Sequence, residues 1–127
     1  MSLSSEKLNL IRQGTVIPAS PLALDNNRRF DERRQRGLMR YYVDAGVGGV
    51  AVGMHFTEFE IRNPGVGLYE PVLRTCAEAV DEWAAKRGRA VVKMAGINGT
   101  ALEARAQAET AAELGYDVAI VSLAAWK

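Results

Sequence analysis

The residues best suited to chemistry follow a short apolar run near the middle of the chain. The run Gly49-Val50-Ala51-Val52-Gly53 is followed at once by Met54-His55-Phe56-Thr57. An imidazole and a hydroxyl can both donate hydrogen bonds to an anionic ligand, and an imidazole can also carry charge at mildly acidic pH. In sheets of parallel strands, ligands bind at the carboxyl ends of the strands. We therefore expect His55 and Thr57 to point into one cavity there.

Other polar side chains have both a chemical and a structural interpretation. Ser20 lies in the turn Pro18-Ala19-Ser20-Pro21, where its hydroxyl either lines the floor of a pocket or bonds to its own backbone. Lys93 stands in the apolar run 90–95, where a desolvated amine would be a nucleophile, although we favour a structural or edge position. Glu58 and Glu60 form a carboxylate pair on a loop that we expect to be exposed.

Glycines and prolines divide the chain into alternating strands and helices. Short apolar runs closed by turn residues predict strands at 15–18, 49–53, 90–95 and 117–122. Apolar positions at helical spacing, ended by a glycine, predict helices at 4–13, 28–44, 70–87 and 101–114. Asn98 or Thr100 is expected to cap the last of these helices. The long loop 54–69 contains the turn Asn63-Pro64-Gly65.

This alternation predicts an α/β fold with a parallel sheet, because each strand–helix unit spans about 35 residues, as a crossover connection requires. Two architectures remain open. A doubly wound sheet would be complete at this length, whereas a TIM barrel has eight strands, of which this chain holds about four. Strand order separates them: 1-2-3-4 favours the barrel, and 2-1-3-4 would exclude it. Gly46, Gly48 and Gly49 are no dinucleotide fingerprint, because they follow a helix and open a strand.

Composition excludes several classes of protein. The 127 residues are the length of a single domain, 1–127, and 16 basic against 15 acidic residues leave a net charge of +1. We therefore expect no nucleic-acid partner, although arginines cluster between Arg28 and Arg36. No apolar run is long enough for a membrane span, so we expect no membrane partner. The single cysteine, Cys76, favours a reduced, cytoplasmic setting.

Four segments, taken in order, resemble the dihydrodipicolinate synthase/N-acetylneuraminate lyase family. They cover about residues 14–122. The first is Ile17-Pro18-Ala19-Ser20-Pro21-Leu22 with Phe30-Asp31, similar to the family's first strand and helix start. The second is Ala45-Gly46 with Gly49-Val50-Ala51-Val52-Gly53, and the third is Val91-Val92-Lys93-Met94-Ala95-Gly96 with Asn98 and Thr100. The fourth is Leu114-Gly115-Tyr116-Asp117-Val118-Ala119-Ile120-Val121.

This resemblance implies a (β/α)8 TIM barrel and a class I aldolase or lyase. In the family a lysine on strand six forms a Schiff base with pyruvate or another 2-oxo acid, without metal or other cofactor, and a tyrosine lies on strand five. The loop after strand two holds the substrate carboxylate, and one of its threonines relays protons. Here Met54-His55-Phe56-Thr57-Glu58 stands where the family has Thr-Thr-Gly-Glu. Thr57 retains the hydroxyl of one of the family's two threonines, and Phe56 stands in the position of the other.

We therefore expect the N-terminal half of a TIM barrel from a Schiff-base aldolase-like protein, without the family's catalytic lysine and tyrosine. Thr57 is its candidate catalytic residue, and Ser20, His55, Phe56 and Thr57 are its candidate substrate-binding residues. A small 2-oxo acid is the expected partner, and a homo-oligomer is the expected assembly. The alternative is a small, non-catalytic parallel α/β module that binds a ligand or a partner at its strand ends.

Overall fold

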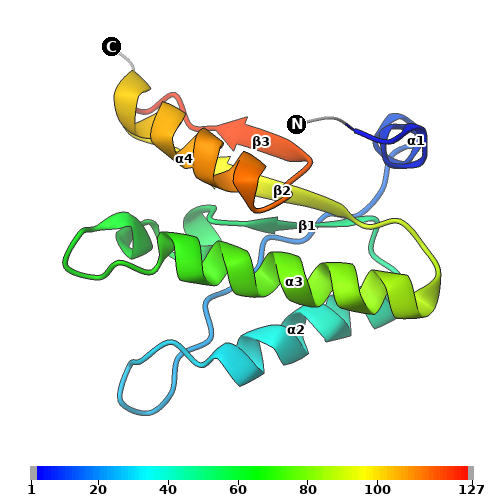
Figure 1. Ribbon diagram of the computed structural model, residues 1–127, viewed down its shortest axis with the longest axis horizontal. Helices are drawn as coiled ribbons and strands as arrows, with labels where there is room; N and C mark the ends of the chain where they lie inside the picture. Colours follow the sequence, from blue (N-terminus) through cyan, green and yellow to red (C-terminus); the bar gives the residue numbers. More distant parts are fainter. Residues whose placement is uncertain (1–2, 126–127) are drawn as a thin grey trace.

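A three-stranded parallel sheet is the centre of the structure, a computed structural model that describes residues 3–125 (Figure 1). Its strands are β1 (Gly49–Val52), β2 (Val92–Ile97) and β3 (Val118–Val121). The α-helices are α1 (Ser5–Gln13), α2 (Glu32–Ala45), α3 (Tyr69–Arg87) and α4 (Ala101–Glu113). Two short 3₁₀ helices, η1 (His55–Thr57) and η2 (Phe59–Arg62), lie in the loop after β1. None of the helices in the described part is long and apolar enough to cross a bilayer.

The strands are parallel and adjacent in the order in which they occur along the chain, β1-β2-β3. An extended segment at 16–20 lies along the free edge of β1, where Ala19 and Ala51 form a parallel bridge. Hydrogen bonds from Gly48 N to Val16 O and from Ser20 N to Ala51 O hold this segment in place. The sequential order favours the barrel over the doubly wound sheet.

The first predicted strand differs from the structure. Residues 15–18 do not form a regular strand, and the parallel bridge lies after them, at Ala19. Pro18 explains the difference, because a proline has no N–H to donate to a strand ladder. Its carbonyl still accepts a hydrogen bond from Ala51 N, at 2.9 Å. The segment therefore occupies the place of a first strand with only part of a strand's hydrogen bonds.

The second predicted helix begins later than expected, at Glu32 rather than Arg28. Asp31 is its N-cap and accepts a hydrogen bond from Arg34 N. The preceding residues form a turn in which the Asp25 carboxylate accepts hydrogen bonds from the backbone N–H groups of Asn27 and Arg29. Side-chain competition for the backbone thus delays the helix by one turn. Thr100 caps α4, with Glu103 completing a capping box.

Helices α2, α3 and α4 cover one face of the sheet, and α1 lies near the amino ends of the strands (Figure 1). The core between sheet and helices is made of apolar side chains that include Val50, Val52, Ala95, Met39, Val43, Leu73, Cys76 and Val80. Burial raises the pKa of the Cys76 thiol to about 12, so it is a packing residue rather than a nucleophile. The side chains of β3 are less well covered, with Ile120 and Val121 40% and 42% exposed.

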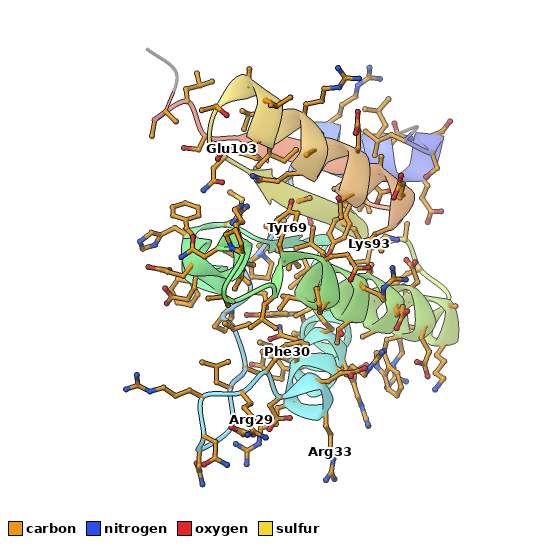
Figure 2. The ribbon with its side chains drawn as sticks, turned by 60° about the vertical axis from the view of Figure 1, so that its left-hand side comes forward. Arg29, Phe30, Arg33, Tyr69, Lys93 and Glu103 are labelled. Atoms are coloured by element: carbon orange, nitrogen blue, oxygen red, sulfur yellow. The ribbon has the colours of Figure 1, made fainter. Side chains whose placement is uncertain are left out.

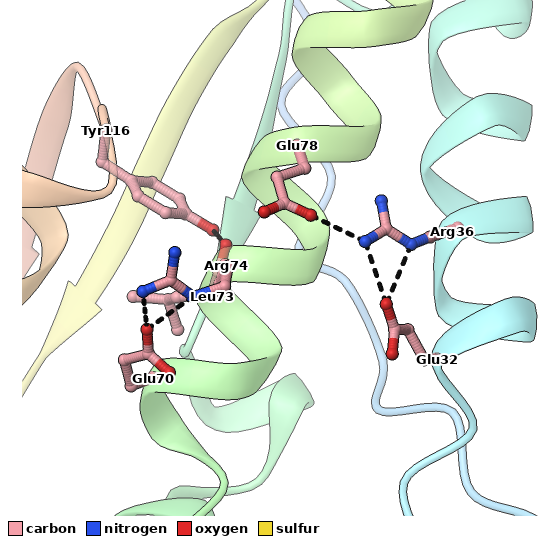
Figure 3. Close-up of polar contacts among 7 residues, drawn as sticks. All are labelled: Glu32, Arg36, Glu70, Leu73, Arg74, Glu78 and Tyr116. Atoms are coloured by element: carbon pink, nitrogen blue, oxygen red, sulfur yellow. Dashed lines mark hydrogen bonds and ion pairs between the residues drawn. The ribbon is translucent and has the colours of Figure 1, made fainter.

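Polar contacts join α3 to its neighbours on both sides (Figure 3). Arg36 of α2 bonds to Glu32 of its own helix and to Glu78 of α3, the latter at 2.7 Å. On the opposite side, the Tyr116 hydroxyl donates to the carbonyl of Leu73 at 2.8 Å. The Arg36 pairs are exposed and stabilise little, whereas the tyrosine bond is buried. These contacts set the position of α3, whose first turn reaches the carboxyl end of the sheet.

Candidate functional site

The carboxyl ends of the strands carry a small cavity of about 140 Å³. Most of its lining is apolar or backbone, and the polar side chains in it come from His55 and Ser122; the remaining lining residues are Gly53, Met54, Phe59, Gly96, Ile97 and Ile120. We call this the mouth cavity. It lies where ligands bind in parallel α/β folds, at the edge where successive strands end.

His55 is exposed at the rim of the mouth cavity. Its ring packs edge-to-face against Phe59, with ring centroids 5.6 Å apart and an interplanar angle of 75°. This contact orients the imidazole while leaving it accessible to a ligand. Phe56, also in η1, is 61% exposed and is not among the residues that line the mouth cavity.

Thr57 and Ser20 belong to a buried polar network instead. Both are fully buried. The Thr57 hydroxyl donates to the Ser20 carbonyl at 2.6 Å and accepts from Gly53 N at 3.1 Å. The Ser20 hydroxyl donates to Pro21 O and accepts from the buried Gln35 amide. His55 and Thr57 therefore do not share a cavity, contrary to the sequence-based expectation, because the hydroxyl turns back toward the backbone of two other segments.

Arg62, at the end of η2, is a site residue that sequence reasoning missed. Its Nη2 donates to the carbonyl of Gly53, the residue after β1, at 2.7 Å. It also donates to the carbonyl of Gly96, the last residue but one of β2, at 2.8 Å. Its Nε donates to the Gln107 side chain at 2.9 Å. Arg62 thus fastens the loop to two adjacent strand ends. Nothing in the sequence marks it, since an arginine in a polar loop is usually solvated, although its apolar neighbour Ile61 hints that the loop packs inward.

The Arg62 guanidinium lies against aromatic rings, 4.6 Å from the ring centroid of Tyr69 and 5.6 Å from that of Phe59. Burial lowers the pKa of Arg62, and burial also raises the pKa of Tyr69. The third nitrogen, Nη1, is buried and has no hydrogen-bond partner among residues 3–125. The loop therefore places a desolvated positive charge at the rim of the sheet.

Two glycines allow the strand ends to approach closely. A Cβ on Gly96 would lie 2.4 Å from the carbonyl oxygen of Gly53, and Gly53 itself has a φ of +82°. Only glycine fits both requirements. The Gly96 carbonyl accepts hydrogen bonds from both Arg62 and the Tyr69 hydroxyl. The mouth cavity thus has a rigid backbone floor.

Lys93 lies away from the mouth cavity. Figure 2 labels Lys93. Its side chain is 6% exposed, and its Nζ is paired with Asp81 of α3 at 2.7 Å. The parallel register places Lys93 opposite Val50, whose side chain belongs to the core under the helices. The other lysines in the described part, Lys7 and Lys86, pair with Asp117 and Glu82. Glu58 and Glu60 are exposed, and residues 3–125 contain no cluster of His, Cys, Asp or Glu side chains suited to a metal ion.

No protein-family model matches this sequence, and no curated protein sequence matches it. Solved structures do. N-acetylneuraminate lyase from Mycoplasma synoviae is 19% identical, with a TM-score of 0.63 over 84% of this chain and 35% of that chain. Dihydrodipicolinate synthase from Rhodopseudomonas palustris is 14% identical, with a TM-score of 0.72 over 95% of this chain and 35% of that chain.

A third structure is a prophage protein of the dihydrodipicolinic acid synthase family from E. coli K12, in complex with pyruvate. It is 20% identical, with a TM-score of 0.65 over 83% of this chain and 33% of that chain. This chain therefore spans about a third of the length of the structures that it matches. The resemblance and the fold class predicted from the sequence are confirmed, because the similar structures are TIM barrels of that same family.

Proposed function

We propose that this chain is part of a class I aldolase or lyase that acts on pyruvate or another 2-oxo acid. A lysine outside this chain would form the Schiff base, and the loop after β1 would supply one side of the substrate pocket. The observation that carries the proposal is the position of the mouth cavity: it lies at the carboxyl ends of parallel strands in sequential order, in a fold shared with lyases and synthases of this kind. One of the similar structures holds pyruvate.

The roles of the loop residues follow from their surroundings. His55, accessible at the rim, contacts the substrate and donates a hydrogen bond to it. Phe56, on the exposed side of η1 and outside the lining of the mouth cavity, would contact only a substrate that extends beyond that cavity. Thr57 and Ser20 support the loop, because their hydroxyls are already occupied by protein partners. The backbone of Gly53 and Gly96 lines the part of the cavity nearest the strands.

In the proposed barrel a further strand would pair with β3. The apolar side chains at that end of the chain support this, because Val121 and Leu123 are 42% and 64% exposed and no strand of the described part lies beyond β3. An open parallel edge with apolar side chains is a strongly associating surface in water.

Borohydride trapping tests the proposed function. The protein encoded by the complete reading frame, incubated with pyruvate and borohydride, should gain one reduced pyruvate adduct, which peptide mass spectrometry should map to a lysine beyond Lys127. The 127-residue chain alone should gain none, because the lysines among residues 3–125, Lys7, Lys86 and Lys93, are all held in ion pairs away from the mouth cavity. Lys93→Met in the complete protein is the matched control and should leave the adduct unchanged.

The same ion pairs favour a second candidate, a non-catalytic module that binds a ligand at its strand ends. The two candidates differ in one outcome. Saturable pyruvate binding to the complete protein without any borohydride-trapped adduct would support the module and exclude the aldolase. An adduct on Lys93 of the short chain would contradict both the proposal and the structural role of that lysine.

A further inference from the structure

Gly37 is a glycine that the packing of the chain does not explain. It is exposed in the middle of α2, and a Cβ built on it would have nothing within 4 Å. Each of the other glycines has a positive φ, would crowd a neighbouring atom with a Cβ, or lies in the turn at Gly65. Glycine is the poorest helix former after proline. The open helix surface at Gly37 therefore lowers the stability of α2 without serving a contact within the fold.

Gly37 borders a groove between α2 and α3 with a volume of about 330 Å³. The charged and aromatic side chains that line this groove are Arg33, Arg36 and Arg40 of α2 and Glu82 and Trp83 of α3. Arg33 and Gly37 also line a second hollow, of about 620 Å³, on the surface of α2. Because Gly37 has no side chain, the helix backbone is open to both hollows. We call the two hollows together the arginine groove.

Three arginines at the start of α2 have no counter-ion in the described part of the protein. Arg28, Arg29 and Arg33 are exposed, and none of them forms an ion pair within residues 3–125. Figure 2 labels Arg29 in the loop before α2 and Arg33 in the first turn of that helix. An antiparallel bridge between Leu24 and Phe30 holds the loop. The unpaired arginines therefore project from a defined backbone.

The carboxylates near the arginine groove are already paired. Glu32 and Glu78 both bind Arg36, and Glu82 binds Lys86. Exposed pairs of this kind contribute little to stability, so an arginine in one of them can exchange its partner. The whole chain has a net charge of only +1, yet this surface has an excess of positive charge at the start of α2.

Arg40 and Trp83 form an aromatic and cationic patch within the groove. The Arg40 guanidinium lies 4.4 Å from the ring centroid of Trp83, and it reaches the Asp44 carboxylate only at 4.0 Å. Stacking on the indole orients this guanidinium while its N–H groups form no hydrogen bond within residues 3–125. Arginine and tryptophan are enriched in the energetic centres of protein–protein interfaces. The side chains of the groove are therefore typical of a protein-binding surface.

We propose that the arginine groove docks an acidic segment of a partner protein, whose backbone passes over Gly37. Carboxylates of that segment pair with Arg33 and Arg40, and the missing Cβ at Gly37 lets the segment approach the helix closely. A nucleic acid fits this surface less well, because Glu32 and Glu78 would lie against a continuous row of phosphates. A peptide can place its carboxylates opposite the arginines alone.

Closure of the proposed barrel leaves the arginine groove accessible. Met39 and Val43 of α2 face the core, whereas Arg33, Gly37 and Glu82 are exposed. The helices of a TIM barrel surround its strands, and α2 and α3 already pack on each other. None of the residues that line the arginine groove lines the mouth cavity. The docking surface is therefore independent of the proposed aldolase function.

Fluorescence anisotropy of a labelled peptide tests the proposal. The protein encoded by the complete reading frame is titrated into fluorescein-labelled octaglutamate at physiological ionic strength. Labelled octalysine, and a labelled oligothymidylate with the net charge of octaglutamate, are the two comparison arms. We expect saturable binding of octaglutamate, weaker binding of the oligothymidylate and no binding of octalysine. Absence of octaglutamate binding, or equal or tighter binding of the oligothymidylate, would overturn the proposal.

Two substitutions locate the binding surface. Arg33→Glu should lower the affinity for octaglutamate at least tenfold, because it replaces an unpaired positive charge by a negative one. Glutamate is favoured in the first turn of a helix, so α2 should persist in this variant. Gly37→Leu changes no charge, fills the space above the helix backbone and increases helix propensity. It should lower the affinity about fivefold or more.

Arg12→Glu is the matched control, because it makes the same change of charge at an exposed position in the last turn of α1, outside the groove. It should lower the affinity less than about twofold. Equal losses in Arg12→Glu and Arg33→Glu would show that the affinity follows net charge alone. Wild-type affinity in Gly37→Leu would show that the segment does not approach the helix backbone. Either result would contradict the proposal.

Discussion

Replacing Thr57 by valine separates a supporting role for this residue from a substrate-binding one. Valine has nearly the same shape as threonine but no hydroxyl, so the Ser20 carbonyl and the Gly53 N–H would each lose a buried partner. A buried backbone group left without a partner costs about 1–3 kcal/mol. We therefore expect Thr57→Val to lower the free energy of unfolding of the 127-residue chain by about 3 kcal/mol.

The assay is urea unfolding of the 127-residue chain followed by circular dichroism, with Thr57→Ser as the matched control. Serine keeps the hydroxyl and loses one buried methyl group, so its cost should be about 1 kcal/mol. If Thr57→Val is as stable as the wild type to within about 0.5 kcal/mol, the hydrogen bonds of Thr57 contribute nothing and the reasoning is wrong. Loss of ligand binding in a fully stable variant would instead point to direct contact with substrate.

Two further substitutions test the strand ends and a helix cap. Gly96→Ala should lower the free energy of unfolding by about 3 kcal/mol, because its Cβ would lie 2.4 Å from the carbonyl oxygen of Gly53. Gly37→Ala is the control: it lies in a helix, its Cβ would have nothing within 4 Å, and it should raise the free energy of unfolding by about 0.5–1 kcal/mol. Equal effects of the two substitutions in urea unfolding would contradict the close approach of Gly96 to Gly53. Glu103→Gln should destabilise the chain at pH 7. The pKa of Glu103 is lowered in the folded state, so its contribution is present above the unfolded pKa and is lost as the pH falls through the folded value. The difference between the two proteins in thermal unfolding should therefore persist below the ordinary glutamate pKa and vanish only once the folded carboxyl is protonated. A difference that stays constant as the pH falls would argue against the capping interaction.

The order of strands and helices could be predicted because its signals are local. Gly46 and Gly88 end helices in the left-handed conformation, as expected for glycines that follow an apolar helical stripe. The Asn63-Pro64-Gly65 turn is present, with the Asn63 carbonyl accepting from Val66 N. Deviations occur where side chains or a proline interfere with the backbone, at Asp25 before α2 and at Pro18 in the first extended segment.

The candidate site was less predictable, because its contacts join residues far apart in the sequence. The loop after β1 and the accessible position of His55 follow from strand polarity alone. The direction of the Thr57 hydroxyl does not, since its acceptor, Ser20, lies 37 residues earlier in the chain. The same is true of Arg62, whose partner Gly96 lies 34 residues later. Neither of these long-range contacts produces a recognisable sequence pattern within the loop.

The bond between Arg62 and Gly96 also has a consequence for the order of folding. The loop after β1 cannot acquire its final shape until β2 has paired with β1, because one of the two carbonyls that accept from the Arg62 guanidinium belongs to β2. Bringing Arg62 and Gly96 together, 34 residues apart in the sequence, costs conformational entropy of the chain before their hydrogen bond can form. The loop should therefore become ordered late, after the transition state, so that substitutions at Arg62 accelerate unfolding and leave the folding rate almost unchanged.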